Sequence, residues 1–159
     1  MTLKDAKTGQ HLAAVIAKLV DSDFAQIRRT RDYIFKWEDE KQYEVLKIFL
    51  KNENDKILGL MSLIDRQDEY RIHLNLIEVA QTNVGRQKKI NNIAGCLIAT
   101  ACKISFDRGY NGFVSLKPKT RLIPLYQDKY GFRQYGRFLA IEGRDSDLLI
   151  RNYLYDEDE

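Results

Sequence analysis

The sequence has few prolines, cysteines and histidines, and each shortage excludes a class of structure. Only two prolines occur, Pro118 and Pro124, so most of the chain can form regular structure with short connections. Two cysteines, Cys96 and Cys102, share one apolar stretch and would diverge on a helix, so we expect buried thiols in a reducing compartment. Each histidine stands alone, without a second ligand at metal-binding spacing, and no metal site is predicted.

Long hydrophobic runs are also missing. No apolar run approaches the roughly 20 residues that a membrane-spanning helix needs. The first residues, 1–10, are polar and lack the apolar centre of a signal peptide. The sequence therefore predicts a cytoplasmic protein without membrane association.

Charge of one sign is not in large excess. The chain has 26 basic and 23 acidic residues, with a formal net charge of +3. This near balance argues against a nucleic-acid-binding domain, which typically has a basic stripe. A local basic cluster could still attract a small polyanion.

The length and composition suit one domain. A chain of 159 residues, 44% of them hydrophobic, can fill a single core. No internal repeat or linker divides the sequence. We therefore expect one domain over residues 1–159, in which the acidic tail, residues 156–159, is frayed.

The first part of the chain has helical patterns followed by strand patterns. Apolar residues at helical spacing predict a helix over residues 9–20, and a second helix is expected from Ser22 or Asp23 to about Lys36. Three strand-like runs then follow with turn residues between them, at residues 43–51, 56–65 and 70–79. Such short turns predict an antiparallel meander.

The remainder reads as a crossover unit. A helix is expected over residues 93–106, ended by Gly109, and a strand over 113–116. Two strands around a crossover helix are parallel neighbours in most folds. The further expected elements are a helix at 120–129 with Pro124 near its start and Gly131 at its end, a strand at 135–141 and a short helix at 148–154. The fold class is therefore α+β, with a mixed sheet.

A polar, basic loop, residues 81–92, precedes the helix expected to begin at Ile93. Free backbone N–H groups and the positive end of the helix dipole would face this loop. Arg86, Lys88 and Lys89 add positive charge. The arrangement suits a phosphate group, although a solvated basic loop is the alternative interpretation.

Three segments together resemble the GNAT superfamily of N-acetyltransferases over about residues 56–141. The strand at 74–79 leads through a loop to a helix that ends in Arg108-Gly109-Tyr110, and the strand at 112–116 follows. The third and most specific segment, residues 125–132, has the family's tyrosine, helical turn, glycine and phenylalanine. The resemblance implies the GNAT-like mixed sheet, with an antiparallel meander followed by a parallel strand pair around a crossover helix.

The resemblance also implies the acyl donor, acetyl-CoA. The family binds its pyrophosphate with the motif Q/R-x-x-G-x-G/A, which Lys89, Asn92 and Ala94 match with Asn92 in a glycine place. The loop before the motif is longer than usual, which is similar to a divergent subgroup with a long lysine-rich loop. The implied donor-binding residues are Ile77, Val79, Arg86, Lys88, Lys89, Asn92, Ile93, Ala94 and Gly95.

Two residues are the catalytic candidates that the resemblance implies. Tyr126 would protonate the departing thiolate, and a packed aromatic is the alternative interpretation. Glu78 would act as general base, next to Val79, whose N–H could polarise the thioester; a surface or ion-paired glutamate is the alternative. His73 and Glu69 are weaker candidates for the base.

The predicted function is transfer of an acetyl group from acetyl-CoA to a primary amine whose identity stays open, by a monomer or a homodimer. The alternatives are a catalytically weak or inactive module that binds acyl-CoA or a protein, and a nucleic-acid factor that uses the basic cluster of residues 86–89. The enzymatic reading requires splayed strands beside Val79 and Phe113, an open start of the helix at Ile93, and Tyr126 at the cleft.

Overall fold

The antiparallel meander is confirmed. The computed structural model describes residues 1–155 and contains β3 (Glu44–Leu50), β4 (Gly59–Arg66) and β5 (Arg71–Val79), which pair in sequence order. The 3₁₀ helix η2 (Gln67–Glu69) forms the turn between β4 and β5. The predicted frayed tail, residues 156–159, lies outside the described residues.

The helix predicted over residues 9–20 is wrong. The chain first forms β1 (Lys4–Asp5) and then β2 (Ala14–Lys18), which pairs antiparallel with β3 along its whole length. The apolar spacing that suggested a helix arises because β2 and the residues beside it pack against two cores: Leu12 and Ile16 contact the main core, and Leu19 contacts a second core. A short apolar run does not distinguish these two periodicities by itself.

The second predicted helix ends early. Helix α1 (Asp21–Thr30) stops at Arg31, which has the left-handed φ of 53°. Irregular chain follows up to the 3₁₀ helix η1 (Trp37–Glu40). The Asp32 carboxylate accepts hydrogen bonds from the N–H and the hydroxyl of Thr82, so the chain is tied to the loop after β5 instead of continuing as a helix.

The crossover unit is confirmed. Helix α2 (Ile93–Asp107) joins β5 to β7 (Val114–Leu116), and these two strands pair in parallel. The 3₁₀ helix η5 (Thr120–Leu122) leads into α3 (Ile123–Tyr130), which Gly131 ends with a φ of 80°. The predicted strand 135–141 is a hairpin of β8 (Arg133–Tyr135) and β9 (Phe138–Ile141), and the last helix, α4 (Gly143–Leu154), begins earlier than expected.

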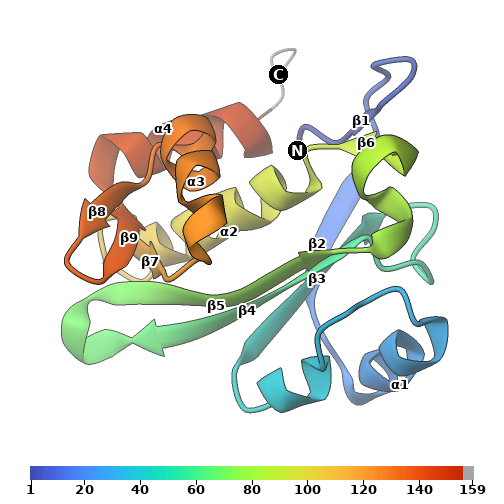
Figure 1. Cartoon of the computed structure of the whole chain (residues 1–159), viewed down its shortest axis with the longest axis horizontal. Coiled ribbons are helices and arrows are strands. Elements are labelled where there is room, and N and C mark those ends of the chain that lie inside the picture. Colours follow the sequence, from blue (N-terminus) through green and yellow to red (C-terminus); the bar gives the residue numbers. More distant parts are fainter. Residues whose placement is uncertain (156–159) are drawn as a thin grey trace.

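In the described part of the chain, the main sheet has seven strands in the order β2-β3-β4-β5-β7-β9-β8, with helices on both faces (Figure 1). Helices α2, α3 and α4 cover one face over the main core, where the thiols of Cys96 and Cys102 are buried as expected. Helix α1 and η1 cover the other face over the smaller core around Trp37 and Leu60. No helix within residues 1–155 is long and apolar enough to cross a membrane.

We predict that Gly112→Ala destabilises the protein strongly. Gly112 has a φ of 72°, and an added Cβ would lie 2.5 Å from the Phe106 ring and 2.7 Å from the Ser146 hydroxyl. Overpacking and left-handed strain together should lower the free energy of unfolding by about 2–4 kcal/mol, measured by urea denaturation. The control is Gly136→Ala: its φ is 58°, but nothing lies within 4 Å. Equal losses in the two variants would contradict the packing described at Gly112.

Candidate active site

A cleft opens in the middle of the sheet because the parallel strands β5 and β7 separate early. β5 and β7 pair only through Ile72 with Val114 and His73 with Ser115. β7 ends at Leu116, whereas β5 continues to Val79 with no strand of the described residues 1–155 on that side. The cavity there measures about 350 Å³, in the usual range for small-molecule sites.

A β-bulge in β5 shapes the cleft. Ser62 of β4 pairs with Leu76 and Leu63 pairs with Leu74, which leaves Asn75 as the extra residue. Bulges bend a strand and increase its twist, which turns β5 away from β7 at this point. Residues 74–77, the bulged stretch, form one wall of the cavity.

Tyr126 lies on the cleft, as the enzymatic reading requires. Its ring packs against Tyr130 and Phe132, with centroid distances of 5.9 and 5.7 Å, and only 8% of the residue is exposed. Burial raises the pKa of its phenol above the ordinary value, so the hydroxyl keeps its proton at neutral pH. Within residues 1–155 this hydroxyl has no hydrogen-bond partner, which leaves the proton available to a ligand.

Glu78 is buried and multiply hydrogen-bonded, which matches neither alternative raised for it. Its carboxylate accepts hydrogen bonds from the Ile34 N–H at 2.7 Å, the Phe35 N–H at 3.3 Å and the Trp37 Nε1–H at 2.9 Å. These bonds fasten the segment before η1 to β5. The structure thus gives Glu78 an anchoring contact, and its role as a base stays a prediction.

Glu40 is a second buried carboxylate that the sequence did not single out. One oxygen, Oε1, accepts hydrogen bonds from the Ser62 hydroxyl and the Asn75 amide, both at 2.6 Å. Asn75 also lines the cleft, so Glu40 fixes the bulged residue. In the sequence, Glu40 is one of several acidic residues before a strand, and nothing in that pattern distinguishes it.

The long loop before α2 is folded around Asn83. It contains the 3₁₀ turns η3 (Gln81–Asn83) and η4 (Gly85–Gln87) and the short strand β6 (Ile90–Asn91), which pairs with β1. The buried Asn83 amide accepts from the N–H groups of Lys89 and Ile90 and donates to the Ile90 carbonyl. Arg86, Lys88 and Lys89 are exposed on this ordered loop.

The start of α2 has backbone N–H groups that are available to a ligand. Asn92 adopts the left-handed conformation with a φ of 77°, the geometry for which the family motif uses glycine. Within residues 1–155, the N–H groups of Ile93, Ala94 and Gly95 have no acceptor.

Segments remote in the sequence border this helix start. The Asn92 amide donates to the Thr2 carbonyl at 2.8 Å, and the Thr2 N–H donates to the Tyr153 carbonyl at 2.9 Å. The Tyr153 ring lies so close to Gly95 that an added Cβ would be 2.2 Å away. One side of the helix start is therefore covered by side chains.

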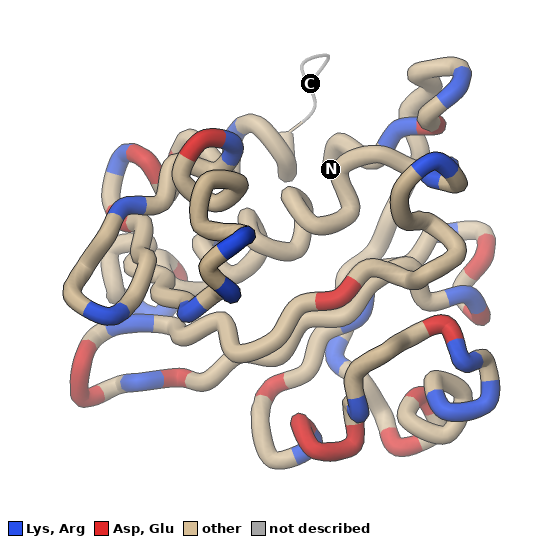
Figure 2. The backbone as a smooth tube through the Cα atoms, viewed as in Figure 1, with Lys and Arg blue, Asp and Glu red and all other residues tan. Residues whose placement is uncertain are grey.

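The predicted donor-binding residues are not all equally near the cleft. Ile77 lines the cavity, whereas Val79 packs against the main core. The opposite wall carries three cations that are not among the predicted donor-binding residues: Lys117, Lys119 and Arg121. In Figure 2, basic positions (blue) gather on the segment that enters α3.

His73 is half-buried on β5, one residue before the cleft-lining stretch that begins at Leu74. Its Nδ1 is 2.9 Å from the Ser115 hydroxyl, and the ring packs edge-on against Phe138. Burial, and then the positive charge of Arg71, lowers the pKa of His73 to about 4. Within residues 1–155, no three His, Cys, Asp or Glu side chains gather as metal ligands.

No family model and no curated protein matches the chain. Solved structures do match. Nourseothricin acetyltransferase has a TM-score of 0.59 and 14% identity, over 82% of this chain and 98% of that one. A GNAT-family acetyltransferase from Staphylococcus aureus Mu50 has a TM-score of 0.57 and 16% identity, over 82% of this chain and 99% of that one. The aminoglycoside acetyltransferase AAC(6')-Ib, in complex with coenzyme A and kanamycin, has a TM-score of 0.60 and 10% identity, over 87% of this chain and 99% of that one. The chain therefore has the GNAT fold.

We predict a low measured pKa for His73. In the His11→Gln variant, His73 is the only imidazole, and its NMR titration should give a pKa of about 4. The pKa of this imidazole is about 6.5 in the unfolded chain and lower in the folded protein, so the unfolded chain binds the proton first as the pH falls. The free energy of unfolding is therefore highest above pH 6.5 and decreases as the pH falls toward 4. His73→Gln should flatten the dependence of unfolding free energy on pH in that window. A measured pKa above 6 would refute the buried environment of this ring.

Proposed function

We propose that the protein is an acetyl-CoA-dependent N-acetyltransferase that acts on a primary amine. The observation that carries the proposal is the cleft between β5 and β7 with the buried, protonated Tyr126 on its wall. The fold it shares with acetyltransferases supports the same reaction class. Coenzyme A occupies the solved aminoglycoside enzyme, which makes the donor a reasonable ligand for this cleft.

The start of α2 is the proposed site for the donor's pyrophosphate. The unsatisfied N–H groups of Ile93, Ala94 and Gly95 are suitable donors, and the helix dipole favours an anion there. Asn92 keeps the backbone in the required left-handed turn. The residues fit a phosphate group on the side that the Tyr153 ring does not cover.

Basic side chains on two segments would add attraction for the phosphates. Arg86, Lys88 and Lys89 are exposed on the loop before α2, and Lys117 and Lys119 lie on the cleft wall. Charges of one sign around a cleft raise the local concentration of an anionic substrate.

The pantetheine arm is proposed to run along the free edge of β5. From Leu74 to Val79 this edge has no strand neighbour toward β7, so its backbone groups can bond to an amide-containing ligand. The bulge at Asn75 places extra backbone at this edge. A backbone N–H near Ile77 or Val79 would stabilise the charge that develops on the thioester oxygen.

In the proposed reaction, the neutral amine attacks the thioester carbon, a C–N bond forms and the C–S bond breaks. The Tyr126 hydroxyl gives its proton to the departing thiolate. The amine gives up a proton to a base. Two buried carboxylates lie next to the cleft lining: Glu78 follows Ile77 in the sequence, and Glu40 accepts a hydrogen bond from Asn75. Glu78 remains the proposed base. Glu40 is a second candidate base, because its carboxylate is hydrogen-bonded to the bulged residue Asn75 on the cleft wall.

A non-catalytic acyl-CoA-binding module is the second candidate. It is favoured by the cover that Thr2 and Tyr153 place over one side of the α2 start, and by Asn92 in a glycine place. Such a module would bind the donor but release CoA no faster than the uncatalysed reaction.

We predict that Tyr126→Phe lowers kcat about 100-fold and leaves the dissociation constant of acetyl-CoA within about twofold. The variant removes the proton donor but keeps the ring and its packing on Phe132. Turnover is followed as CoA release with a thiol reagent, and affinity by calorimetry. The matched control is Tyr130→Phe, a change on the same helix away from the cavity wall. Equal turnover in wild type and Tyr126→Phe would favour the non-catalytic module.

A further inference from the structure

Asn75, on the wall of the cleft, has a side-chain amide that is held at one end only. It is the extra residue of the bulge in β5, it is exposed, and it lines the cavity between β5 and β7. Its Nδ2 donates a hydrogen bond of 2.6 Å to Glu40 Oε1. Within residues 1–155 its Oδ1 has no hydrogen-bond partner. The amide therefore has one fixed end and one end that is available to a ligand.

Glu40 determines which end of the amide is fixed. A carboxylate only accepts hydrogen bonds, so the amide has to turn its NH₂ group toward Glu40. The Ser62 hydroxyl donates to the same carboxylate oxygen at 2.6 Å, and both Ser62 and Glu40 are buried. The reversed amide would bring two unpaired oxygens together at this buried position, which is unfavourable. The contact thus keeps the Asn75 carbonyl oxygen on the side away from Glu40.

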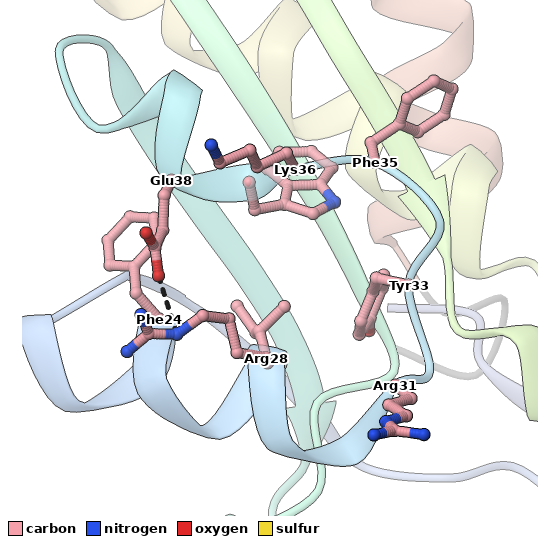
Figure 3. A pocket seen from close by; sticks show the side chains of 9 residues that line it. Phe24, Arg28, Arg31, Tyr33, Phe35, Lys36 and Glu38 are labelled. Atoms are coloured by element: carbon pink, nitrogen blue, oxygen red, sulfur yellow. Dashed lines mark ion pairs between the residues drawn. The ribbon is translucent and has the colours of Figure 1, made fainter.

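The cleft next to Asn75 has apolar walls. Phe35 and residues 76–77 line it together with Asn75. Phe35 also borders the neighbouring cavity beside α1, but Figure 3 shows its ring pointing away from the Arg28–Glu38 ion pair of that cavity. Apolar walls exclude water, and a hydrogen bond formed beside them is stronger than one in bulk solvent.

The other wall of the cleft carries cations, which favour a neutral amine over an ammonium ion. Lys117, Lys119 and Arg121 line it, and within residues 1–155 none of them has an ion pair. No residue of the described cleft lining is acidic. Positive charges nearby lower the pKa of a bound amine, whereas a carboxylate in contact with the amine would raise it. The uncharged oxygen of Asn75 can therefore accept a hydrogen bond from the amine and leave it in the nucleophilic form.

We propose that Asn75 Oδ1 binds the amino group of the acceptor and makes the site selective for primary amines. The inference rests on the proposed acetyl transfer and names the group that orients its acceptor. A neutral primary amine would donate one N–H to Asn75, attack the thioester carbon with its lone pair and give the other proton to the base. A secondary amine has only the N–H that the base removes, so it would lack the bond to Asn75. Glu40 is the positioning residue of this contact.

The test compares primary amines with their N-methyl derivatives. The probes are benzylamine, glycinamide and ethanolamine, each paired with the compound that has one methyl group on the reacting nitrogen. Turnover is followed as CoA release with acetyl-CoA as donor. In the wild type, kcat/KM should be at least about tenfold higher for the primary member of the pair with the best acceptor, as expected for one hydrogen bond to the reacting nitrogen.

Three variants separate the contact from the bulk of the added methyl group. Asn75→Ala removes the oxygen, so the preference for the primary amine should fall at least about fivefold, while the dissociation constant of acetyl-CoA stays within about twofold. A methyl group that only clashes with the cleft would disfavour the secondary amine equally in both proteins. Ser62→Ala is the matched control, because it removes the other donor to Glu40 outside the cleft lining and should keep the wild-type preference. Glu40→Ala releases the Asn75 amide and should lower the preference as well.

The outcomes separate this inference from the proposed function. An unchanged preference in Asn75→Ala overturns the inference and leaves the acetyltransferase proposal standing. Equal losses of preference in Ser62→Ala and Asn75→Ala also overturn it, because the buried network and not the free oxygen would then determine the preference. The wild-type preference in Glu40→Ala would overturn the positioning role of Glu40. If no probe is acetylated above the uncatalysed rate, or acetyl-CoA at millimolar concentration produces no thermal shift, the inference fails together with the proposed function.

Discussion

The early end of the parallel pairing between β5 and β7 is the constraint on which the rest of the site depends. Only two residue pairs join these strands, and the bulge at Asn75 turns the remainder of β5 away. The sheet core is thereby opened along one strand edge, whose backbone groups need partners. A ligand that lies along this edge would complete the sheet and would meet Tyr126 on the opposite wall.

Two buried carboxylates hold the other side of this opening in place. Glu40 fixes Asn75 and Ser62, and Glu78 fixes the segment that contains Phe35. Each carboxylate is satisfied by two or three donors, which offsets the cost of burying it. Asn75 and Phe35 both line the cleft, so the two glutamates hold part of its wall.

The sequence predicts those parts of the fold that depend on local patterns. Turn residues define the meander, and Gly109 and Gly131 end α2 and α3 where expected. The motif in residues 125–132 singles out Tyr126, which lines the cleft in the structure. The parts that were missed depend on remote contacts: β2 is a strand because the edge of β3 is available, and Thr2 meets Tyr153 over the start of α2. Glu40 was missed because burial of one acidic residue among several is decided by packing alone.

A crystal structure with bound CoA tests the central claim most directly. The account predicts that the pantetheine arm lies between β5 and β7, hydrogen-bonded to β5 backbone beyond Leu74, with its sulfur about 3–4 Å from the Tyr126 hydroxyl. The diphosphate should lie at the N–H groups of residues 93–95. Density for CoA outside this cleft, or a Tyr126 hydroxyl turned away from the sulfur, would contradict the account.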